Sequence, residues 1–314
     1  MSSDYVIVGA GLSGTVLGVR LSEDPSITVM ILEASSTPFH TDNIDVPGKA
    51  LRKAGIDRYS PETPWQLSCL SSYVTFKLFI LQDGAIINIG CSGKSIGGST
   101  LLNFMQYNRA AAVEYDALEK KLGTEGWNWD NLLPYFKKLQ TLNCTEEYAA
   151  KFRQKFDPKF HGNGSLQTHI PKYVSPVTMP WIKTVKRQGI KHNPDLVTGD
   201  ITGAWVNIAT LDNKSVRSTS GSAYYKPNQS HSNLKVISGT LATKVLTSGS
   251  EPVVTTEVEY LKDGTLHTIK ATKEVILSAG SYKTVQILEL SDAQALCQFV
   301  ELLMQGQVSA ILRS

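Results

Sequence analysis

Residues 5–14 read Tyr-Val-Ile-Val-Gly-Ala-Gly-Leu-Ser-Gly, and this stretch decides the fold. The apolar run 5–8 is rich in β-branched side chains, which predicts a buried strand. After the glycines, Leu17 and Leu21 lie one helical turn apart, and Asp24-Pro25 ends the predicted helix. Residues 28–32 predict a second strand, and this strand ends on Glu33.

The order strand, G-x-G-x-x-G, helix, strand and acid is the dinucleotide-binding fingerprint in its structural context. Gly9 permits a tight turn, Gly11 lets the backbone approach a pyrophosphate, and Gly14 lets the helix pack closely on the strand. The helix N-terminus offers N–H groups and a positive dipole end to phosphates. Glu33 is placed to accept hydrogen bonds from a ribose and would repel a 2′-phosphate, which argues against NADP. The fingerprint by itself leaves FAD and NAD open.

Composition narrows the class of protein. Hydrophobic residues make up 41% of the 314 residues and charged residues 19%, which is globular composition for about two domains. The net charge is +3 and no dense Lys/Arg block occurs, which argues against a nucleic-acid partner. No apolar run reaches the roughly 20 residues of a membrane span, and the first residues lack the features of a signal peptide. We therefore expect no membrane span and a cytoplasmic location.

Neither the cysteines nor the histidines predict a metal site. The four cysteines have no CxxC spacing, and the six histidines have no HxxxH or HExxH spacing. We expect the cysteines to be buried or free thiols.

A second glycine-rich stretch lies at residues 93–103, which read Gly-Lys-Ser-Ile-Gly-Gly-Ser-Thr-Leu-Leu-Asn, followed by Phe-Met-Gln-Tyr-Asn-Arg at 104–109. Residues 97–100 are candidates for a loop whose backbone N–H groups face an anion or a flavin ring. An ordinary turn before a helix, with Ser99 or Thr100 as the N-cap, explains the same residues equally well. Physical reasoning leaves both interpretations open.

Residues 93–109 resemble the first signature of the glucose–methanol–choline (GMC) oxidoreductases, where it passes the flavin. The resemblance extends over roughly residues 4–291, with several motifs in the family's order. The further matching stretches are 114–116, 126–129, 132–138, 161–164, 217–224, 233–236 and 275–280.

The resemblance implies FAD as cofactor, a small-molecule alcohol as substrate, and hydride transfer from the alcohol carbon to flavin N5 with a neutral histidine as base. Together with the fingerprint it gives these cofactor-binding residues: Gly9, Gly11, Leu12, Ser13, Gly14, Glu33, Ala34, Gly98, Ser99, Asn103, Phe104, Met105 and Ala242.

Within that set, the resemblance places Leu12 and Ser13 near the pyrophosphate, Glu33 at the adenosine ribose, and the residues from Gly98 to Met105 along the flavin. Ala242 would offer its main chain to the adenine, where the family usually has Val. For Phe104 and Met105, which we expect on a helix, a core role is the alternative. Asn103 is expected to be a buried amide that needs partners.

We predict an α/β fold with a Rossmann-like FAD-binding domain, formed by residues 1–150 and 213–314. Residues 151–212 would be part of a substrate-binding domain with an incomplete antiparallel sheet. The later strands are predicted at 234–238, 242–246, 253–261, 267–271 and 274–278, with a hairpin turn around 262–264. Residues 213–232 are expected to be a connecting loop, and Trp127 and Trp129 to be packing anchors.

We find no family resemblance after Ser291. Residues 292–314 have helical apolar spacing and fit either an amphipathic helix or an out-of-frame or alternatively spliced ending. The family's catalytic histidine lies beyond this point, and the tail contains no histidine. The expected alternatives are therefore an alcohol oxidoreductase by family, an inactive flavin-binding fragment, or a non-redox lyase that keeps FAD. His161, with a structural role expected, and His169 are the remaining candidate bases. Exposed sheet edges would promote self-association.

Overall fold

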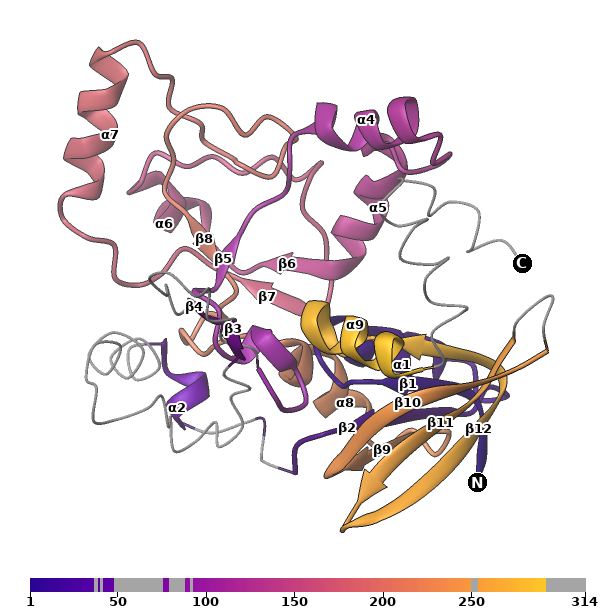
Figure 1. The fold of residues 1–314 in the computed structure, drawn as a ribbon. Helices are drawn as coiled ribbons and strands as arrows, with labels where there is room; N and C mark the ends of the chain where they lie inside the picture. Colours follow the sequence, from indigo (N-terminus) through magenta and orange to yellow (C-terminus); the bar gives the residue numbers. More distant parts are fainter. Residues whose placement is uncertain are drawn as a thin grey trace, which may run out of the picture. The chain divides into compact units, whose positions relative to one another are not determined.

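The computed structural model describes residues 1–36, 39, 42–47, 76–78, 88–90, 93–249 and 254–291. In this part of the chain there are two compact units (Figure 1). Unit 1 contains Met1–Asn103 and the described residues from Thr219 onward, and unit 2 contains Phe104–Ser218.

Unit 1 is built on a sheet whose described strands run in the order β10-β11-β12-β1-β2-β9 (Figure 1). The strands β12, β1, β2 and β9 are parallel, and β10 and β11 extend them by antiparallel pairing. Helix α1 packs on β1 and β2, and α9 packs on β10. This α/β arrangement confirms the predicted Rossmann-like fold. The elements of unit 1 are β1 (Ser2–Val8), α1 (Leu12–Leu21), β2 (Val29–Glu33), α2 (Asp42–Asp45), β3 (Phe76–Leu78), β4 (Asn88–Gly90), η2 (Gly98–Leu101), η3 (Gly221–Tyr225), α8 (Lys226–Asn228), β9 (Leu234–Ser238), β10 (Thr240–Ser248), β11 (Val254–Lys262), β12 (Thr265–Leu277) and α9 (Gly280–Leu290).

The first two strands form the centre of the parallel sheet because their side chains are apolar on both faces. Val6 and Ile7 are fully buried, and every residue of β2 is buried. A parallel strand covered on both faces needs such a continuous apolar run. Val8 pairs with Leu32, so β1 and β2 end at the same edge of the sheet. Residues 9–14 and the side chain of Glu33 therefore meet at this carboxyl edge, where ligands bind in open α/β sheets.

The hairpin turn predicted around 262–264 joins β11 to β12. Lys262 pairs with Thr265, and the two residues between them have positive φ, +50 at Asp263 and +77 at Gly264. An Asp-Gly pair with both φ values positive is typical of a type I′ turn, which matches the twist of the flanking strands. The two strands predicted at 267–271 and 274–278 are wrong in one respect, because β12 runs without a break from Thr265 to Leu277. One half of β12 pairs with β11 and the other half with β1, which accounts for the break in apolar pattern.

The prediction of a connecting loop over 213–232 is also wrong in part. Residues 221–225 form the π-helix η3, and α8 follows directly. Tyr224 is buried against α1, where the Arg20 guanidinium lies 5.3 Å above its ring. The polar composition hid this element because its serines are satisfied locally, as in the hydrogen bond from Thr219 N–H to Ser222 Oγ.

Unit 2 combines short strand pairs with helices around a separate core. Strand β5 pairs with β8 antiparallel, and β6 pairs with β7 parallel. The core contains Ile170, Leu196, Val197 and Ile208, which are all fully buried. The elements of unit 2 are β5 (Gln106–Tyr107), α4 (Ala112–Leu122), α5 (Trp129–Leu139), β6 (Gln140–Leu142), α6 (Glu146–Ala150), β7 (Leu166–Thr168), α7 (Thr178–Arg187) and β8 (Ile208–Ala209).

Residues 114–116, one of the stretches that resemble the family, lie in α4 and contact α5. The Asp116 carboxylate accepts a hydrogen bond from Trp129 N–H at 3.1 Å, and the Tyr115 ring lies 5.8 Å from that of Trp129. Trp129 is 8% exposed and is a packing anchor as predicted. Trp127 is 56% exposed, so the same prediction is wrong there. Trp127 precedes the N-cap residue Asn128 and lies outside the helix that carries the apolar face.

The change from unit 1 to unit 2 comes after Asn103, whereas the sequence analysis placed a domain boundary after residue 150. The intervening stretch belongs with unit 2 because its strands find their partners there, β5 with β8 and β6 with β7. The return to unit 1 comes after Ser218, close to the expected position at 213. No helix in the described ranges is both long and apolar enough to cross a membrane.

Candidate dinucleotide site

The nucleotide loop, residues 9–14, leaves the carboxyl end of β1 and turns into α1. Gly9 N–H donates to the carbonyl of Leu32 at 2.8 Å, and its φ of +96° lies in the region that favours glycine. A Cβ on Gly9 would lie 2.6 Å from the carbonyl oxygen of Ser278. Both the backbone conformation and the packing therefore require glycine at this turn.

Gly14 and Gly11 differ in whether the surrounding protein leaves room for a side chain. A Cβ on Gly14 would lie 1.9 Å from the carbonyl oxygen of Gly9, so only glycine lets α1 start this close to the loop. A Cβ on Gly11 would meet Ser278 O at 3.8 Å, which is ordinary contact, and the φ of Gly11 is −70°. No described neighbour therefore requires glycine at position 11, which leaves open space beside the helix N-terminus.

The first turn of α1 is open to a ligand. Gly11 is its N-cap, and no side chain makes a capping hydrogen bond. The first N–H groups of a helix have no partner within the helix. Leu12 is 56% exposed and Ser13 is also exposed, whereas Gly14 and Thr15 behind them are buried. The free N–H groups and the positive end of the helix dipole together make an anion-binding position.

Glu33 ends β2 with its carboxylate folded under the nucleotide loop. Its Oε2 accepts a hydrogen bond from Ala10 N–H and its Oε1 one from Ser35 N–H, both at 2.9 Å. Burial raises the pKa of Glu33, while the two backbone donors and the charge of Lys94 oppose that rise. Each carboxylate oxygen keeps a second lone pair, so the residue fixes the loop and can still accept from a ribose hydroxyl.

The second glycine stretch approaches the first within unit 1. Gly97 N–H donates to the carbonyl of Ala10 at 2.7 Å, and a Cβ on Gly98 would lie 2.8 Å from the Cα of Gly11. Both Gly97 and Gly98 have positive φ, and η2 begins at Gly98. The Gly97–Thr100 loop, residues 97–100, is thus an irregular backbone segment beside the nucleotide loop, which favours the anion-facing or flavin-facing interpretation over a simple helix cap.

The side chains of the Gly97–Thr100 loop divide into a buried anchor and an exposed group. Thr100 is buried, donates to the carbonyl of Gly97 at 2.5 Å and accepts from Ser220 N–H at 3.2 Å. Ser99 is exposed, and its Oγ accepts from Gly93 N–H at 3.2 Å. The anchor and the buried Gly98 hold the loop, while Ser99 stays exposed.

Three predicted flavin contacts follow the loop, and their environment corrects the sequence analysis. Asn103, in unit 1, is exposed rather than a buried amide. Phe104 and Met105, in unit 2, lie between η2 and β5 and on no helix. Phe104 is 60% exposed, whereas Met105 is 5% exposed with a φ of +60°. The expected helix is therefore wrong, because the chain enters β5 directly after Met105 and pairs there with β8.

Contacts within unit 2 hold Met105 in its left-handed conformation. Its carbonyl accepts from Thr210 N–H at 2.8 Å, and its side chain packs with Ala209 and Leu211. A non-glycine residue in this region costs of the order of 1–3 kcal/mol and persists only where the surroundings impose it.

The last two predicted contacts are main-chain positions in unit 1. Ala34 is half-buried between Glu33 and Ser35. Ala242 pairs with Tyr260 in the β10–β11 ladder, which shifts register between Ala242 and Lys244. The irregularity interrupts the regular pairing next to Ala242, where the resemblance implies an adenine contact through the backbone.

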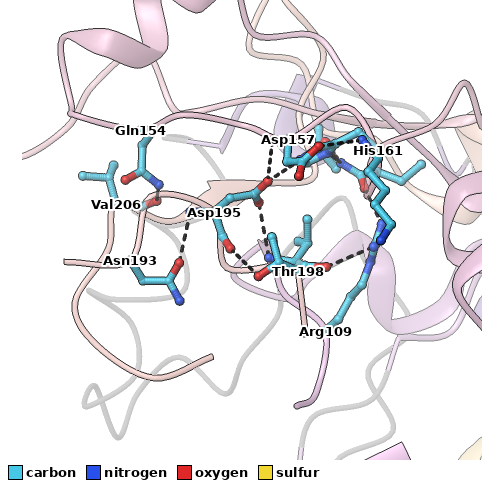
Figure 2. A network of polar contacts seen from close by, with 12 residues as sticks. Arg109, Gln154, Asp157, His161, Asn193, Asp195, Thr198 and Val206 are labelled. Carbon is cyan, nitrogen blue, oxygen red and sulfur yellow. Dashed lines mark hydrogen bonds and ion pairs between the residues drawn. The ribbon is translucent and has the colours of Figure 1, made fainter. Parts of the chain in front are cut away.

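Unit 2 contains a buried polar network that the sequence did not predict as a unit (Figure 2). Arg109 is 2% exposed; it donates from Nη1 to the carbonyl of Val197 at 3.1 Å and from Nη2 to Gln140 Oε1 at 3.0 Å. Its guanidinium also lies 5.1 Å above the Phe136 ring. Gln140 is fully buried and donates from Nε2 to Thr168 Oγ1 at 2.7 Å.

Arg109 determines the tautomer of His161 through Gln140. An arginine side chain only donates, so Gln140 presents Oε1 to Arg109 and its NH₂ group to Thr168 and His161. Gln140 Nε2 lies 3.4 Å from His161 Nδ1, which must therefore accept. The ring proton sits on Nε2, which donates to Asp195 Oδ2 at 3.0 Å. Both ring nitrogens are engaged within unit 2, as expected for a structural histidine.

Asp195 connects this histidine to the neighbouring loops (Figure 2). It is 3% exposed, and its carboxylate also accepts from Asp157 N–H at 3.0 Å and Val197 N–H at 3.3 Å. Every oxygen of this buried acid is thereby satisfied, which is what a buried charge requires. His169, the other candidate base, contacts the Ile170 carbonyl with Nδ1 and packs its ring 5.4 Å from Tyr148.

Comparison with known proteins settles the ancestry. Residues 3–296 match the family described as GMC oxidoreductase. The chain belongs to the GMC oxidoreductase family. It is 34% identical to the dehydrogenase mpl7 of Monascus purpureus over 92% of its length, and 32% identical to the mitochondrial choline dehydrogenase of Homo sapiens over 91%. This GMC oxidoreductase chain spans 45% of each of these two relatives, or about half their length.

Solved structures give the same answer. An FAD-dependent oxidoreductase from Chaetomium thermophilum is similar with a TM-score of 0.78 and 27% identity, over 92% of this chain and 47% of that one. Pyridoxine 4-oxidase from Mesorbium loti is similar with a TM-score of 0.74 and 25% identity, over 91% of this chain and 51% of that one.

The family and its solved relatives are FAD-dependent, and the residues present fit that cofactor. The open space at Gly11 and the uncapped first turn of α1 suit a pyrophosphate, because nothing else described explains a glycine at that position. The exposed side chain of Ser99 suits a polar ligand beside it.

Sequence reasoning identified the loop residues but missed what anchors them. Thr15, Thr100 and Ser220 hold the two glycine loops by hydrogen bonds to Ala10 O and Gly97 O. In unit 2, Arg109 and His161 stood in matched motifs, but Gln140 and Asp195 had no local signal. Their partners lie far apart in sequence, so spacing alone offered nothing to find them.

Proposed function

We propose that this chain binds FAD in unit 1 and forms the cofactor-binding part of an oxidoreductase that acts on the CH–OH group of alcohols. The observation that supports this most directly is Gly11, where neither the backbone conformation nor the packing of the described residues demands glycine. A ligand phosphate that must approach the backbone is the remaining physical reason for the residue.

The nucleotide loop would hold the AMP half of FAD. The N–H groups at Leu12 and Ser13 donate to the pyrophosphate, and the carboxylate of Glu33 accepts from the adenosine ribose while it keeps Ala10 N–H in place. The Ala34 and Ala242 main chains would contact the adenine. Each of these groups is a backbone or anchored group, so little conformational entropy is lost when the nucleotide binds.

The segment from Gly98 to Met105 would accompany the flavin. Ser99, Asn103 and Phe104 are exposed, whereas Gly98 is buried. Burial of the Phe104 ring against an aromatic cofactor would remove apolar surface from water. Met105 would act indirectly, because it is buried in a left-handed conformation and restrains the backbone next to Phe104.

Bound FAD supplies a hydride acceptor, and an alcohol donor then needs a base for its hydroxyl proton. His161 uses both ring nitrogens within the polar network, so it is not free to take that proton. The relatives are about twice as long as this chain. We therefore propose that the 314-residue chain binds FAD without oxidising alcohols at a useful rate. A positioned base typically contributes about 10²–10⁴-fold.

The test separates binding from turnover. Purified chain incubated with FAD and desalted should keep visible flavin absorption, and Gly11→Val should abolish it while far-UV circular dichroism stays unchanged. Equal FAD retention by Gly11→Val would show that the pyrophosphate lies elsewhere.

Turnover is tested on the flavin-loaded chain. Primary and aryl alcohols added without oxygen should leave the flavin absorption unchanged, because both ring nitrogens of the candidate base His161 are engaged within unit 2. Rapid bleaching by any of them would mean that the chain carries its own base, and the inactivity proposal would then be wrong.

A further inference from the structure

The charge of the chain is concentrated in one stretch. Residues 151–191, here called the basic segment, contain nine of the 31 Lys and Arg residues and one of the 28 Asp and Glu residues. The rest of the chain is left with 22 basic and 27 acidic residues. A local excess of this size inside a chain of net charge +3 indicates an anionic partner more than it indicates solubility.

All nine cations of the basic segment are exposed and belong to unit 2. Among the described residues, Lys191 is the one that has an ion pair, with Asp200. The pKa of His192, which follows the segment, is lowered by burial and then by the charges of Arg153 and Lys186. Those two cations, on different elements, therefore act on the same point. The nine residues are Lys151, Arg153, Lys155, Lys159, Lys172, Lys183, Lys186, Arg187 and Lys191.

Large apolar side chains stand exposed among these charges. Tyr173, Val177 and Trp181 are 79%, 69% and 57% exposed, and they follow one another at intervals of four residues into α7. The side of α7 that carries Met179 and Ile182 is already covered, because Ile182 is buried and Met179 packs on the unit 2 core. Figure 1 shows α7 at the margin of its unit, joined to it by extended connections. The exposed row therefore has no role in the core.

We propose that α7 and its flanking loops dock on an anionic lipid surface. The charges are complementary, since a bilayer that contains phosphatidylserine attracts clustered Lys and Arg side chains. The exposed Val177–Trp181 row fits the same surface, because an interfacial helix inserts apolar and aromatic side chains at the headgroup level. A nucleic acid or a sulfated polymer would use the cations and leave the apolar row exposed to water.

Helix α7 would lie in the plane of the surface rather than cross it. With 10 residues it is too short to span a bilayer, which takes about 20. Lys183, Lys186 and Arg187 would lie at the headgroups with their aliphatic stems along the helix, and Trp181 would sit at the interface. This docking is independent of the FAD site, since it uses none of its residues.

The experiment is cosedimentation of the chain with vesicles of phosphatidylcholine that contain phosphatidylserine, compared with pure phosphatidylcholine. We expect binding to the first and none to the second, with release as salt rises from 50 to 500 mM. The triple variant Lys183→Gln, Lys186→Gln, Arg187→Gln should weaken binding by about 100-fold, at roughly fivefold for each charge near the surface. Trp181→Ala should weaken binding at every salt concentration, because it removes the inserted side chain.

A matched control removes the same charge elsewhere. Lys214→Gln, Lys235→Gln, Lys270→Gln changes three exposed lysines outside the basic segment and should bind as the parent does. Equal loss in both triple variants would mean that net charge acts and the surface does not. Heparin binding as tight as vesicle binding, with Trp181→Ala unaffected, would replace the lipid by a soluble polyanion. Vesicle binding that no variant alters would also overturn the proposal.

Discussion

In the nucleotide loop of unit 1, backbone N–H groups of the first turn of α1 meet no capping side chain. In the polar network of unit 2, by contrast, Gln140, His161 and Asp195 find their partners inside the protein. Arg109 Nε is an exception, since it is buried without a partner among the described residues. One region thus keeps donors for a ligand, and the other closes on itself.

The difference identifies function better than burial or charge does. A buried ionic residue such as Arg109 or Asp195 looks catalytic when considered alone, but its bonds are all directed to parts of its own unit. Gly11 has no functional group, yet its missing side chain is the feature that packing does not explain. Backbone N–H groups without a capping partner beside open space indicate where a ligand binds.

We expect the largest effect from a substitution that breaks the polar network of unit 2. Arg109→Leu removes the donors to Gln140 Oε1 and the Val197 carbonyl and leaves both acceptors buried. We expect a loss of roughly 3–5 kcal/mol in the free energy of unfolding, measured by urea denaturation. Arg187→Leu, at an exposed position of the same unit, should stay within about 0.5 kcal/mol of the parent. Equal stability of the two variants would mean that the network is not a closed structural unit.

Two alanine substitutions in the nucleotide loop distinguish a glycine that packing requires from a glycine that leaves room for a ligand. Gly14→Ala forces a Cβ against the Gly9 carbonyl and should cost about 1–3 kcal/mol of stability. Gly11→Ala meets no close neighbour, so its stability should match the parent while FAD affinity, measured by fluorescence titration, falls at least about tenfold, or about 1.4 kcal/mol. If Gly11→Ala bound FAD normally, the space beside α1 would not be the phosphate position.

The sequence was sufficient for the open region because its signals are local. The glycine spacing, the apolar run of β1 and the acid at the end of β2 all lie within 33 residues, and each reports one physical requirement. The strands β9, β10 and β11 were also predicted close to their observed bounds. The fold class followed from these signals, and the family and the cofactor followed from the resemblance of residues 93–109 and the further motifs to the GMC oxidoreductases.

The polar network of unit 2 could not be predicted from local sequence patterns. Arg109, Gln140 and Asp195 are separated by 31 and 55 residues, and their relation exists only after unit 2 has folded. The same holds for Met105, whose positive φ is imposed by Thr210 more than 100 residues later. The misplaced domain boundary has this cause as well, because β5 and β6 take partners that no local pattern announces.

Two glutamates extend the comparison to pH. Glu33 and Glu119 each accept two hydrogen bonds, yet the pKa of Glu33 is raised by burial and that of Glu119 is lowered by the Asn128 side chain and Gly126 N–H. The contribution of Glu33 to stability is full below its unfolded pKa and is lost as pH rises through the folded pKa. The contribution of Glu119 is present above its unfolded pKa and is lost as pH falls through the folded pKa.

The glutamine variants should therefore diverge on acidification. From pH 7 to pH 4, the stability difference between the parent and Glu33→Gln should move in the parent's favour. The difference between the parent and Glu119→Gln should move against the parent. Denaturation by urea at a series of pH values measures both differences in one protein. Parallel curves for the two variants would contradict the opposite shifts and the role of burial in them.

The smallest effect concerns apolar surface that unit 1 leaves exposed. On α9, Val285 and Leu290 are 47% and 59% exposed, although Ile287 between them is buried in the core. On β12, Val275 and Leu277 are only half-buried, while the neighbouring strand β1 is buried throughout its apolar run. Exposed apolar side chains on a helix and half-buried apolar side chains on a strand promote contact between copies of the chain. Sedimentation velocity should therefore show association that increases with protein concentration.

The variant Val285→Lys, Leu290→Lys should weaken that association several-fold without loss of stability, since exposed helix positions accept lysine readily. The control Val113→Lys, Leu122→Lys changes two exposed apolar residues of α4 in unit 2, which are 73% and 56% exposed. Because α4 lies in unit 2 and packs on α5, the control should associate as the parent does. If both variants reduced association equally, or if the parent stayed monomeric at all concentrations, the contact would not lie on α9.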